Sequence, residues 1–134
     1  MNVENVYPRV AKIISDVLSI DENEISLKKS LIKDLGAESI DFLDLIFQLE
    51  REFKIKAPLR QIEKEARGNL SEGEFEQSGI VTPAGLAVLK QHLSEVPQEN
   101  FKDNFKVKEI PTLFTVETFC KIVVNAIEKQ KTTA

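Results

Sequence analysis

The spacing of apolar residues predicts three long amphipathic helices in this chain. In the first, apolar residues three and four positions apart run from Val10 to Leu18, as one buried helix face requires. Pro8 fits the first turn, where its missing N–H costs little, so Val3 and Val6 would extend the face only through a kink. The polar segment 21–30 predicts a loop, with apolar anchors at Ile25, Leu27 and Leu31.

The second helix is predicted from about Ser39 to Phe53. Its core face consists of Phe42, Leu45, Ile46, Leu49 and Phe53. A second apolar row lies beside that face, and the remaining arc is acidic. The row is Ile40, Leu43 and Phe47, and the acids are Asp41, Asp44, Glu50 and Glu52. One neighbouring helix cannot cover so broad an apolar arc, so several helices wrap it or part of it faces a ligand or partner.

The rest of the chain predicts shorter elements and a last helix. We expect a short basic helix from Leu59 to Arg67, closed by Gly68-Asn69, and an acidic loop over 71–79. Thr82 is a suitable N-cap, with Pro83 in the first helical position, for a helix that reaches Val96. Segment 97–111 is expected to be irregular, anchored by Phe101, Phe105 and Val107. The last helix is predicted from Thr115, followed by a frayed tail over 129–134; its buried face is Val116, Phe119, Cys120, Val123 and Ile127.

The fold class predicted from these patterns is all-α. The β-like runs 79–81 and 106–107 are too short to build a sheet. With 134 residues, 42% of them hydrophobic and 30% charged, the chain fits one globular domain.

Composition excludes several classes of protein. A net charge of −4 argues against a nucleic-acid binder and against attraction to an anionic membrane. No apolar run is long enough for a membrane helix, and residues 1–5 show no secretion signal. A lone cysteine, Cys120, rules out an internal disulfide and suits a reducing compartment. We expect a cytoplasmic monomer without stable membrane insertion.

No catalytic or metal site is predicted. Cys120 lies on an apolar helix face and is interpreted as a core residue, and His92, the only histidine, as a solvated side chain. Ser39 lacks the G-x-S-x-G frame of a hydrolase nucleophile and would need the distant His92 as its base. Segment 21–24 lacks the spacing and glycine of a calcium loop.

The informative stretch is Asp34-Leu35-Gly36-Ala37-Glu38-Ser39-Ile40-Asp41, in which a glycine loop delivers a serine to a helix start. The first amides of a helix are unpaired, and the helix dipole adds about half a positive charge there. A phosphodiester on the Ser39 hydroxyl would therefore be stabilised. Serine is also a good N-cap, although a capping box would need Glu or Gln where Phe42 stands. From these residues alone, both roles remain open.

The wider sequence resembles the acyl carrier protein family. The resemblance rests on segments 30–45, 49–53 and 55–58. The family hallmark Asp-Leu-Gly-x-Asp-Ser-Leu is present with Glu38 for Asp and Ile40 for Leu. The resemblance implies a bundle of three long helices and a short one. It also implies that a phosphopantetheinyl transferase attaches 4′-phosphopantetheine from coenzyme A to Ser39. The thiol of this attached group would then hold an acyl group. The protein would therefore be a carrier and not an enzyme.

The resemblance further implies a docking surface for partner enzymes of lipid or secondary-metabolite biosynthesis, such as an acyl-ACP synthetase or ligase, a ketosynthase or an acyltransferase. By position the docking residues are Glu38, Ile40, Asp41, Asp44, Phe47 and Glu50. Arg51 stands where many relatives carry an acid, which argues against docking to the general fatty-acid synthesis enzymes. The alternatives are an aminoacyl or peptidyl carrier, and a helical adaptor that kept the fold without the arm.

An insertion sets this chain apart from ordinary family members. The resemblance covers a core of residues 3–58 and 112–130, leaving about 59–111 as inserted sequence. Segments 41–44 and 52–59 are similar to carriers of very long-chain hydroxy fatty acids for lipid A. The insertion could shield a long acyl chain, dock a dedicated ligase or acyltransferase, or only stabilise the fold.

Overall fold

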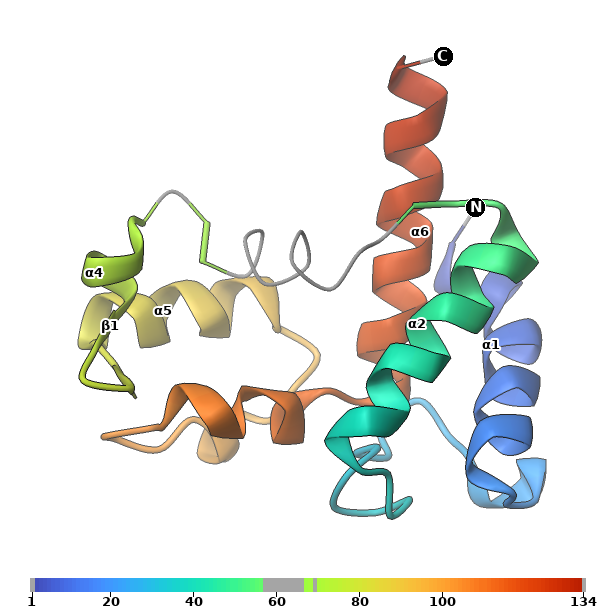
Figure 1. Cartoon of the computed structure of the whole chain (residues 1–134), viewed down its shortest axis with the longest axis horizontal. Helices are drawn as coiled ribbons and strands as arrows, with labels where there is room; N and C mark the ends of the chain where they lie inside the picture. The colour runs from blue at the N-terminus through green and yellow to red at the C-terminus, as the bar shows by residue number, and fades with distance from the viewer. Residues whose placement is uncertain (1, 57–66, 69, 134) are drawn as a thin grey trace.

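The computed structural model describes residues 2–56, 67–68 and 70–133. In this part of the chain, three long helices form a bundle: α1 (Val3–Leu18), α2 (Ser39–Phe53) and α6 (Val116–Thr133). Helix α1 packs against both of the others, and the insertion lies beside the bundle (Figure 1). The predicted all-α class and the start and end of α2 are confirmed.

Helix α1 begins earlier than its sequence predicted. It is continuous from Val3, and Pro8 lies inside it rather than in its first turn. Asn2 caps the helix, because its Oδ1 accepts from the amide of Asn5 at 2.9 Å and the Asn5 side chain accepts from the Asn2 amide at 3.1 Å. Val6 is fully buried, and burial of this side chain offsets the hydrogen bond that Pro8 cannot donate.

The insertion contains more secondary structure than the sequence predicted. Its elements are α4 (Glu72–Phe75), β1 (Glu76–Gln77), β2 (Ile80–Val81), α5 (Pro83–His92) and the 3₁₀ helices η2 (Gln98–Asn100) and η3 (Val107–Leu113). The expected loop over 71–79 is therefore wrong. Ser71 caps α4 through the Glu74 amide, and β1 pairs with β2 in an antiparallel hairpin. Ser78 and Gly79 both have positive φ, as a tight two-residue hairpin turn requires.

Helix α5 starts as predicted, with Thr82 Oγ1 accepting from the Gly85 amide at 3.0 Å. It ends at His92 instead of Val96, although Val96 is still buried. The predicted basic helix from Leu59 to Arg67 lies, except for Arg67, outside the described residues.

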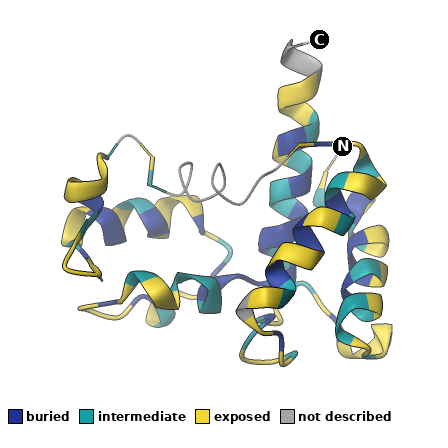
Figure 2. Ribbon diagram, in the orientation of Figure 1, coloured by how far each residue is buried: buried dark blue, intermediate teal, exposed yellow. Residues whose placement is uncertain are grey.

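The insertion contributes buried apolar side chains (Figure 2) that form one cluster with those of the bundle. Its buried side chains are Phe75, Val81, Leu86, Leu89, Leu93, Val96, Phe101 and Phe105. Helix α5 approaches α4 so closely that a Cβ on Gly85 would lie 2.4 Å from the carbonyl oxygen of Phe75. This contact explains why a glycine stands inside a helix.

The insertion joins the bundle through buried groups. Phe114, just after η3, stacks on Phe42 of α2 at 5.8 Å between ring centroids and meets Phe119 of α6 edge to face. Glu95, after α5, pairs with Lys121 of α6 at 2.6 Å. Glu95 therefore connects the insertion to α6, and Phe114, directly after the insertion, packs between α2 and α6.

Helix α6 continues where a frayed tail was expected. It runs to Thr133, and Gln130 fastens it to the end of α2. The Gln130 amide donates to the Lys54 carbonyl at 3.0 Å, and its oxygen accepts from the Lys56 amide at 3.1 Å. Within the described ranges, no helix is both long and apolar enough to span a bilayer.

Candidate functional site

The loop before α2 is held at both of its ends. Leu31 and Ala37 are buried, the Leu31 amide donates to the Phe114 carbonyl at 3.2 Å, and the Ala37 amide donates to the Leu31 carbonyl at 2.8 Å. Gly36 has a φ of +76°, and a Cβ at this position would meet no atom within 4 Å. Glycine is therefore favoured here by the backbone conformation and not by a lack of space for a side chain. The loop therefore fixes where α2 begins.

Glu38 occupies the N-cap position of α2, with an extended backbone. Its amide donates to Oδ2 of Asp41 at 2.8 Å, and the Asp41 amide donates to the Glu38 carbonyl at 2.9 Å. An acid in the first turn is also favoured by the helix dipole. Asp41 is thus a capping residue. The sequence did not predict this role, because with Ser39 as the N-cap the third position would be Phe42, whereas with Glu38 as the N-cap it is Asp41.

Ser39 is the first residue of α2, one position after the cap. The alternative in which Ser39 is itself the N-cap is wrong, because Glu38 holds that place. The amides of Ser39 and Ile40 belong to the first helical turn and so have no carbonyl of the same helix to bond. A serine at this position needs an explanation other than capping.

An exposed apolar row begins next to Ser39 and runs along α2. The exposed fraction is 70% for Ile40, 57% for Leu43 and 55% for Phe47. The predicted core face on the opposite side is buried, except for the half-buried Phe53. The possibility that several helices wrap the whole apolar arc is therefore wrong, and a ligand or partner on the exposed row stays a prediction. Leu43 was left out of the predicted docking residues, although its i, i+3 spacing from Ile40 places it in the same row.

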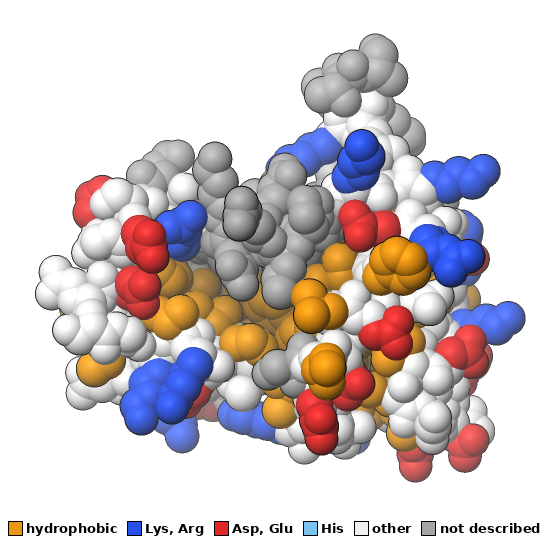
Figure 3. Space-filling view, in the orientation of Figure 1, with side chains coloured by type: hydrophobic (Ala, Val, Ile, Leu, Met, Phe, Trp, Pro, Cys, Tyr) orange, Lys and Arg blue, Asp and Glu red, His pale blue; other side chains and the backbone are white. Residues whose placement is uncertain are grey.

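Acidic side chains border this row near its start (Figure 3). Glu38 and Asp44 are exposed, whereas Asp41 and Glu50 are half-buried. At the other end of the row, the Arg51 guanidinium lies 5.7 Å from the centroid of the Phe47 ring. Acids therefore border the row from Glu38 to Glu50, and Arg51 adds a single cation near its end.

The start of α2 suits the phosphodiester of a phosphopantetheine arm. The unpaired amides of Ser39 and Ile40 can stabilise its negative charge, and the Asp41 carboxylate is turned to the Glu38 amide. Exposed Ile40 and Leu43 offer apolar contacts for the chain that follows the phosphate. The residues present fit the group.

The residues set aside from the sequence stay outside the site. Cys120 is fully buried in α6, and burial raises the pKa of its thiol to about 12, with a smaller contribution from the carboxylate of Glu117. His92 is exposed at the end of α5. In the described part of the chain, no three acidic, histidine or cysteine residues are grouped as metal ligands.

Comparison with known proteins gives consistent matches. The family described as phosphopantetheine attachment site matches residues 8–68, which include Ser39. An acyl carrier protein AcpXL from Rhizobium meliloti is 40% identical over 76 residues, 56% of this chain and 80% of that protein. An acyl carrier protein from Clostridium acetobutylicum is 48% identical over 59 residues, 44% of this chain and 77% of that protein. An acyl carrier protein AcpXL from Mesorhizobium japonicum is 42% identical over 59 residues, 44% of this chain and 63% of that protein.

Proposed function

This chain belongs to the acyl carrier protein family, and from that premise we propose that Ser39 is the residue that carries its 4′-phosphopantetheine. The protein is an acyl carrier and not an enzyme, and phosphopantetheine is its covalent cofactor. When bound, this group supplies a thiol that holds an acyl chain as a thioester. The observation that carries the proposal is the place of Ser39, at the first position of α2 and beyond the cap.

The surrounding residues support an attachment role for Ser39. Leu31 and Ala37 anchor the loop in the core, so the start of α2 is presented in a fixed position. Glu38 and Asp41 complete the cap between them, so the cap does not require the serine. A hydroxyl at this position is therefore available for modification without loss of the helix start.

Mass spectrometry tests the attachment residue. We expect the wild-type protein, incubated with coenzyme A and a phosphopantetheinyl transferase, to gain one phosphopantetheine, and Ser39→Ala to gain none. Ser26→Ala, in the exposed loop before the site, is the matched control and should be modified like the wild type. Modification of the Ser39→Ala protein would contradict the proposal, and a wild-type protein that no transferase modifies would favour the adaptor that lost its arm.

The exposed face of α2 supports a role as the docking surface for the transferase and for biosynthetic enzymes. The proposed contacts are Glu38, Ile40, Asp41, Asp44, Phe47 and Glu50, with Leu43 added by its exposure. Acids around an apolar row suit partners with a basic surface, because complementary charge speeds encounter more than it tightens the complex. Fast release is what a carrier needs.

Charge reversal tests this docking surface. Asp44→Lys should lower the kcat/KM of the transferase for this protein by about tenfold at low salt, because a like charge then faces the basic partner. Glu24→Lys, on the exposed 3₁₀ turn η1 (Glu22–Glu24), changes net charge equally away from α2 and should have a much smaller effect. Equal effects of the two variants would mean that only net charge matters.

The cargo is proposed to be a long acyl chain of lipid biosynthesis, delivered by a dedicated synthetase or ligase, ketosynthase or acyltransferase. The similarity of segments 41–44 and 52–59 to very long-chain carriers favours this cargo, as do the two relatives named AcpXL. The intact mass of the protein purified from its own host identifies the loaded group. A mass matching an amino acid on the arm would instead identify an aminoacyl carrier.

A further inference from the structure

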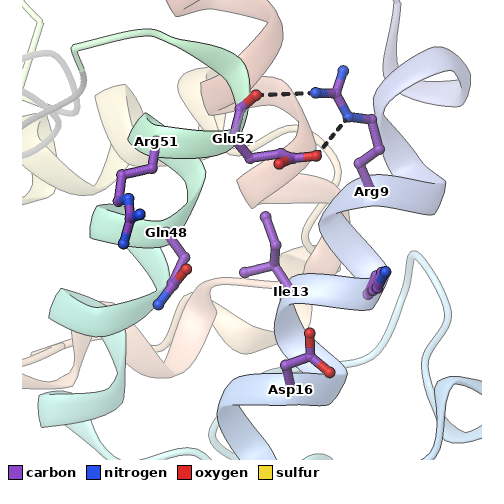
Figure 4. A pocket seen from close by; sticks show the side chains of 7 residues that line it. Arg9, Ile13, Asp16, Gln48, Arg51 and Glu52 are labelled. Atoms are coloured by element: carbon purple, nitrogen blue, oxygen red, sulfur yellow. Dashed lines mark hydrogen bonds and ion pairs between the residues drawn. The ribbon is translucent and has the colours of Figure 1, made fainter.

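An open groove lies between α1 and the C-terminal half of α2 (Figure 4). It has a volume of about 410 Å³, with Ile13 between the two helices and polar side chains around it. Arg9 closes one end of the groove. Its Nε lies 3.1 Å from Oε1 of Glu52, its Nη2 donates to the Glu52 carbonyl at 2.9 Å, and its guanidinium lies 4.4 Å from the centroid of the Phe53 ring. Arg9 and Glu52 therefore form a fixed, charge-balanced wall.

The remaining charges in the groove are mostly positive. Lys12 and Arg51 contribute two cations, against the single carboxylate of Asp16, and all three side chains are exposed. Lys54 and Lys56 follow at the end of α2 and are exposed as well. The lining thus carries a net positive charge beside an amphipathic docking helix.

The groove is continuous with the exposed apolar row. Arg51 comes four residues after Phe47, on the same helix face, and its guanidinium lies over the Phe47 ring. Figure 3 shows acidic side chains mostly around the start of α2 and basic side chains toward its end. A partner that lies along this row meets the carboxylates at the start of α2, then the apolar side chains, and beside the row's end the cations of the groove, Arg51 and Lys12.

We propose that this groove binds a carboxylate-bearing segment of the partner enzyme, with Arg51 and Lys12 as its cationic ligands. The inference rests on the proposed docking role of α2 and adds a second, oppositely charged subsite to it. The occupant is an acidic protein segment rather than a free anion, because the subsite adjoins an apolar row that only a larger surface covers. Opposite charges at the two ends also fix direction, since a reversed partner would place like charges together.

Titration of the full-length, ¹⁵N-labelled protein with two peptide probes tests the proposal by NMR. Acetyl-hexaglutamate amide should give saturable shifts at the amides of Lys12, Gln48 and Arg51, whereas acetyl-hexalysine amide should shift those of Glu38, Asp41 and Asp44. The double variant Lys12→Glu/Arg51→Glu should weaken hexaglutamate binding about tenfold or more and leave hexalysine binding intact. A Lys106→Glu/Lys108→Glu variant, with the same charge change on exposed positions of the insertion, is the control and should still bind hexaglutamate in the groove.

Three results would overturn the proposal. Hexaglutamate could give no saturable shifts, could shift Lys106 and Lys108 as strongly as the groove, or could bind the groove variant unchanged. Lys12→Gln/Arg51→Gln, which removes charge without adding repulsion, gives a second measurement and should weaken binding to a smaller extent. The mass of each variant after incubation with transferase and coenzyme A tests the attachment proposal separately. If the groove variants are modified but do not bind hexaglutamate, the attachment proposal stands.

Discussion

At the scale of single residues, two potential nucleophiles are separated by their surroundings. Ser39 is the first residue of α2, whereas Cys120 lies inside the bundle with no exposed surface. Desolvation disfavours the thiolate, which is the reactive form of cysteine. The protein therefore keeps its own thiol protonated and leaves thiol chemistry to the arm.

Alkylation should distinguish the buried thiol of Cys120 from the thiol of the arm. Native protein without the arm should not react with iodoacetamide at about pH 8, because Cys120 is buried and protonated. Protein carrying the arm should take up one label on the arm, and denatured protein should also be labelled at Cys120. Intact mass measures the number of labels, and rapid labelling of the native, unmodified protein would show that Cys120 is accessible.

The same thiol predicts a loss of stability at alkaline pH. The pKa of Cys120 is raised from 9.0 to about 12 in the folded protein. The contribution of the buried thiol to the free energy of unfolding is therefore fully present below about pH 9. As pH rises from there toward about 12, only the unfolded chain ionises, and the free energy of unfolding falls by about 1.4 kcal/mol per pH unit. Urea unfolding of wild type and Cys120→Ala measures this, because the variant should lack that part of the slope. If the free energy of unfolding fell equally steeply with pH in the wild type and in Cys120→Ala, the raised pKa of Cys120 would be contradicted.

At the scale of elements, the residue that caps α2 differs from the residue that we propose as the attachment site. The Asp41 carboxylate bonds the Glu38 amide, and Ser39 lies between them in sequence. Capping and the proposed modification thereby fall to different residues, so the cap bond of Asp41 does not depend on Ser39.

Substitutions in the first turn should separate these roles. Asp41→Ala should lower the free energy of unfolding by about 1 kcal/mol through loss of the cap bond, and Asp41→Asn should recover most of it. Ser39→Ala should change stability by less than about 0.5 kcal/mol, because it removes no cap. Denaturant unfolding of the unmodified proteins measures all three. A larger loss for Ser39→Ala than for Asp41→Ala would return the capping role to Ser39.

The contact between α6 and the segment after α5 depends on a buried carboxylate. The Glu95 side chain is 3% exposed and accepts from Thr118 Oγ1 and from Lys121 Nζ, whereas the Lys121 side chain is 32% exposed. Removal of Lys121 and removal of Glu95 should therefore have different effects on the remaining charge. A carboxylate without its cation would stay buried, but the ammonium could reach water.

Single substitutions should show that asymmetry. Lys121→Met should cost about 3–5 kcal/mol, because it leaves a buried charge unpaired, and Glu95→Ala should cost about 1–3 kcal/mol. The double variant should recover part of the Lys121→Met loss, as a thermodynamic cycle would measure. Equal losses for both single variants would show that the carboxylate is not held in a desolvated position.

At the scale of the whole molecule, the insertion is a small folded unit attached to a carrier bundle. Its buried side chains, among them Phe75, Leu89 and Phe105, belong to the same apolar cluster as those of the bundle, and Glu95 pairs with Lys121 of α6. Relatives are shorter than this chain, since 76 residues make up 80% of the first. The matched family covers residues 8–68, which include α2 and most of α1.

Loosening or removing the insertion tests whether it determines cargo or partner. Replacing residues 60–110 by a short linker should leave phosphopantetheine attachment intact while changing the acyl group loaded in the host. Gly85→Ala should loosen the insertion without shortening the chain, because its Cβ would lie 2.4 Å from the Phe75 carbonyl oxygen; hydrogen exchange should rise in the insertion and not in the bundle. Unchanged cargo and partner choice in both variants would leave only a stabilising role.

The sequence alone determined the features that depend on local patterns. Apolar spacing predicted α2 from Ser39 to Phe53, and the segments 30–45, 49–53 and 55–58 indicated the family, because both signals lie along short stretches of the chain. The docking role of Ile40 and Phe47 came from the family resemblance. Tertiary structure decided what depends on contacts far apart in the chain. Val6 is buried despite Pro8, the 71–79 segment folds against α5, and Arg9 meets Glu52 across two helices. These outcomes follow from the burial of apolar surface between distant segments, which no local pattern records.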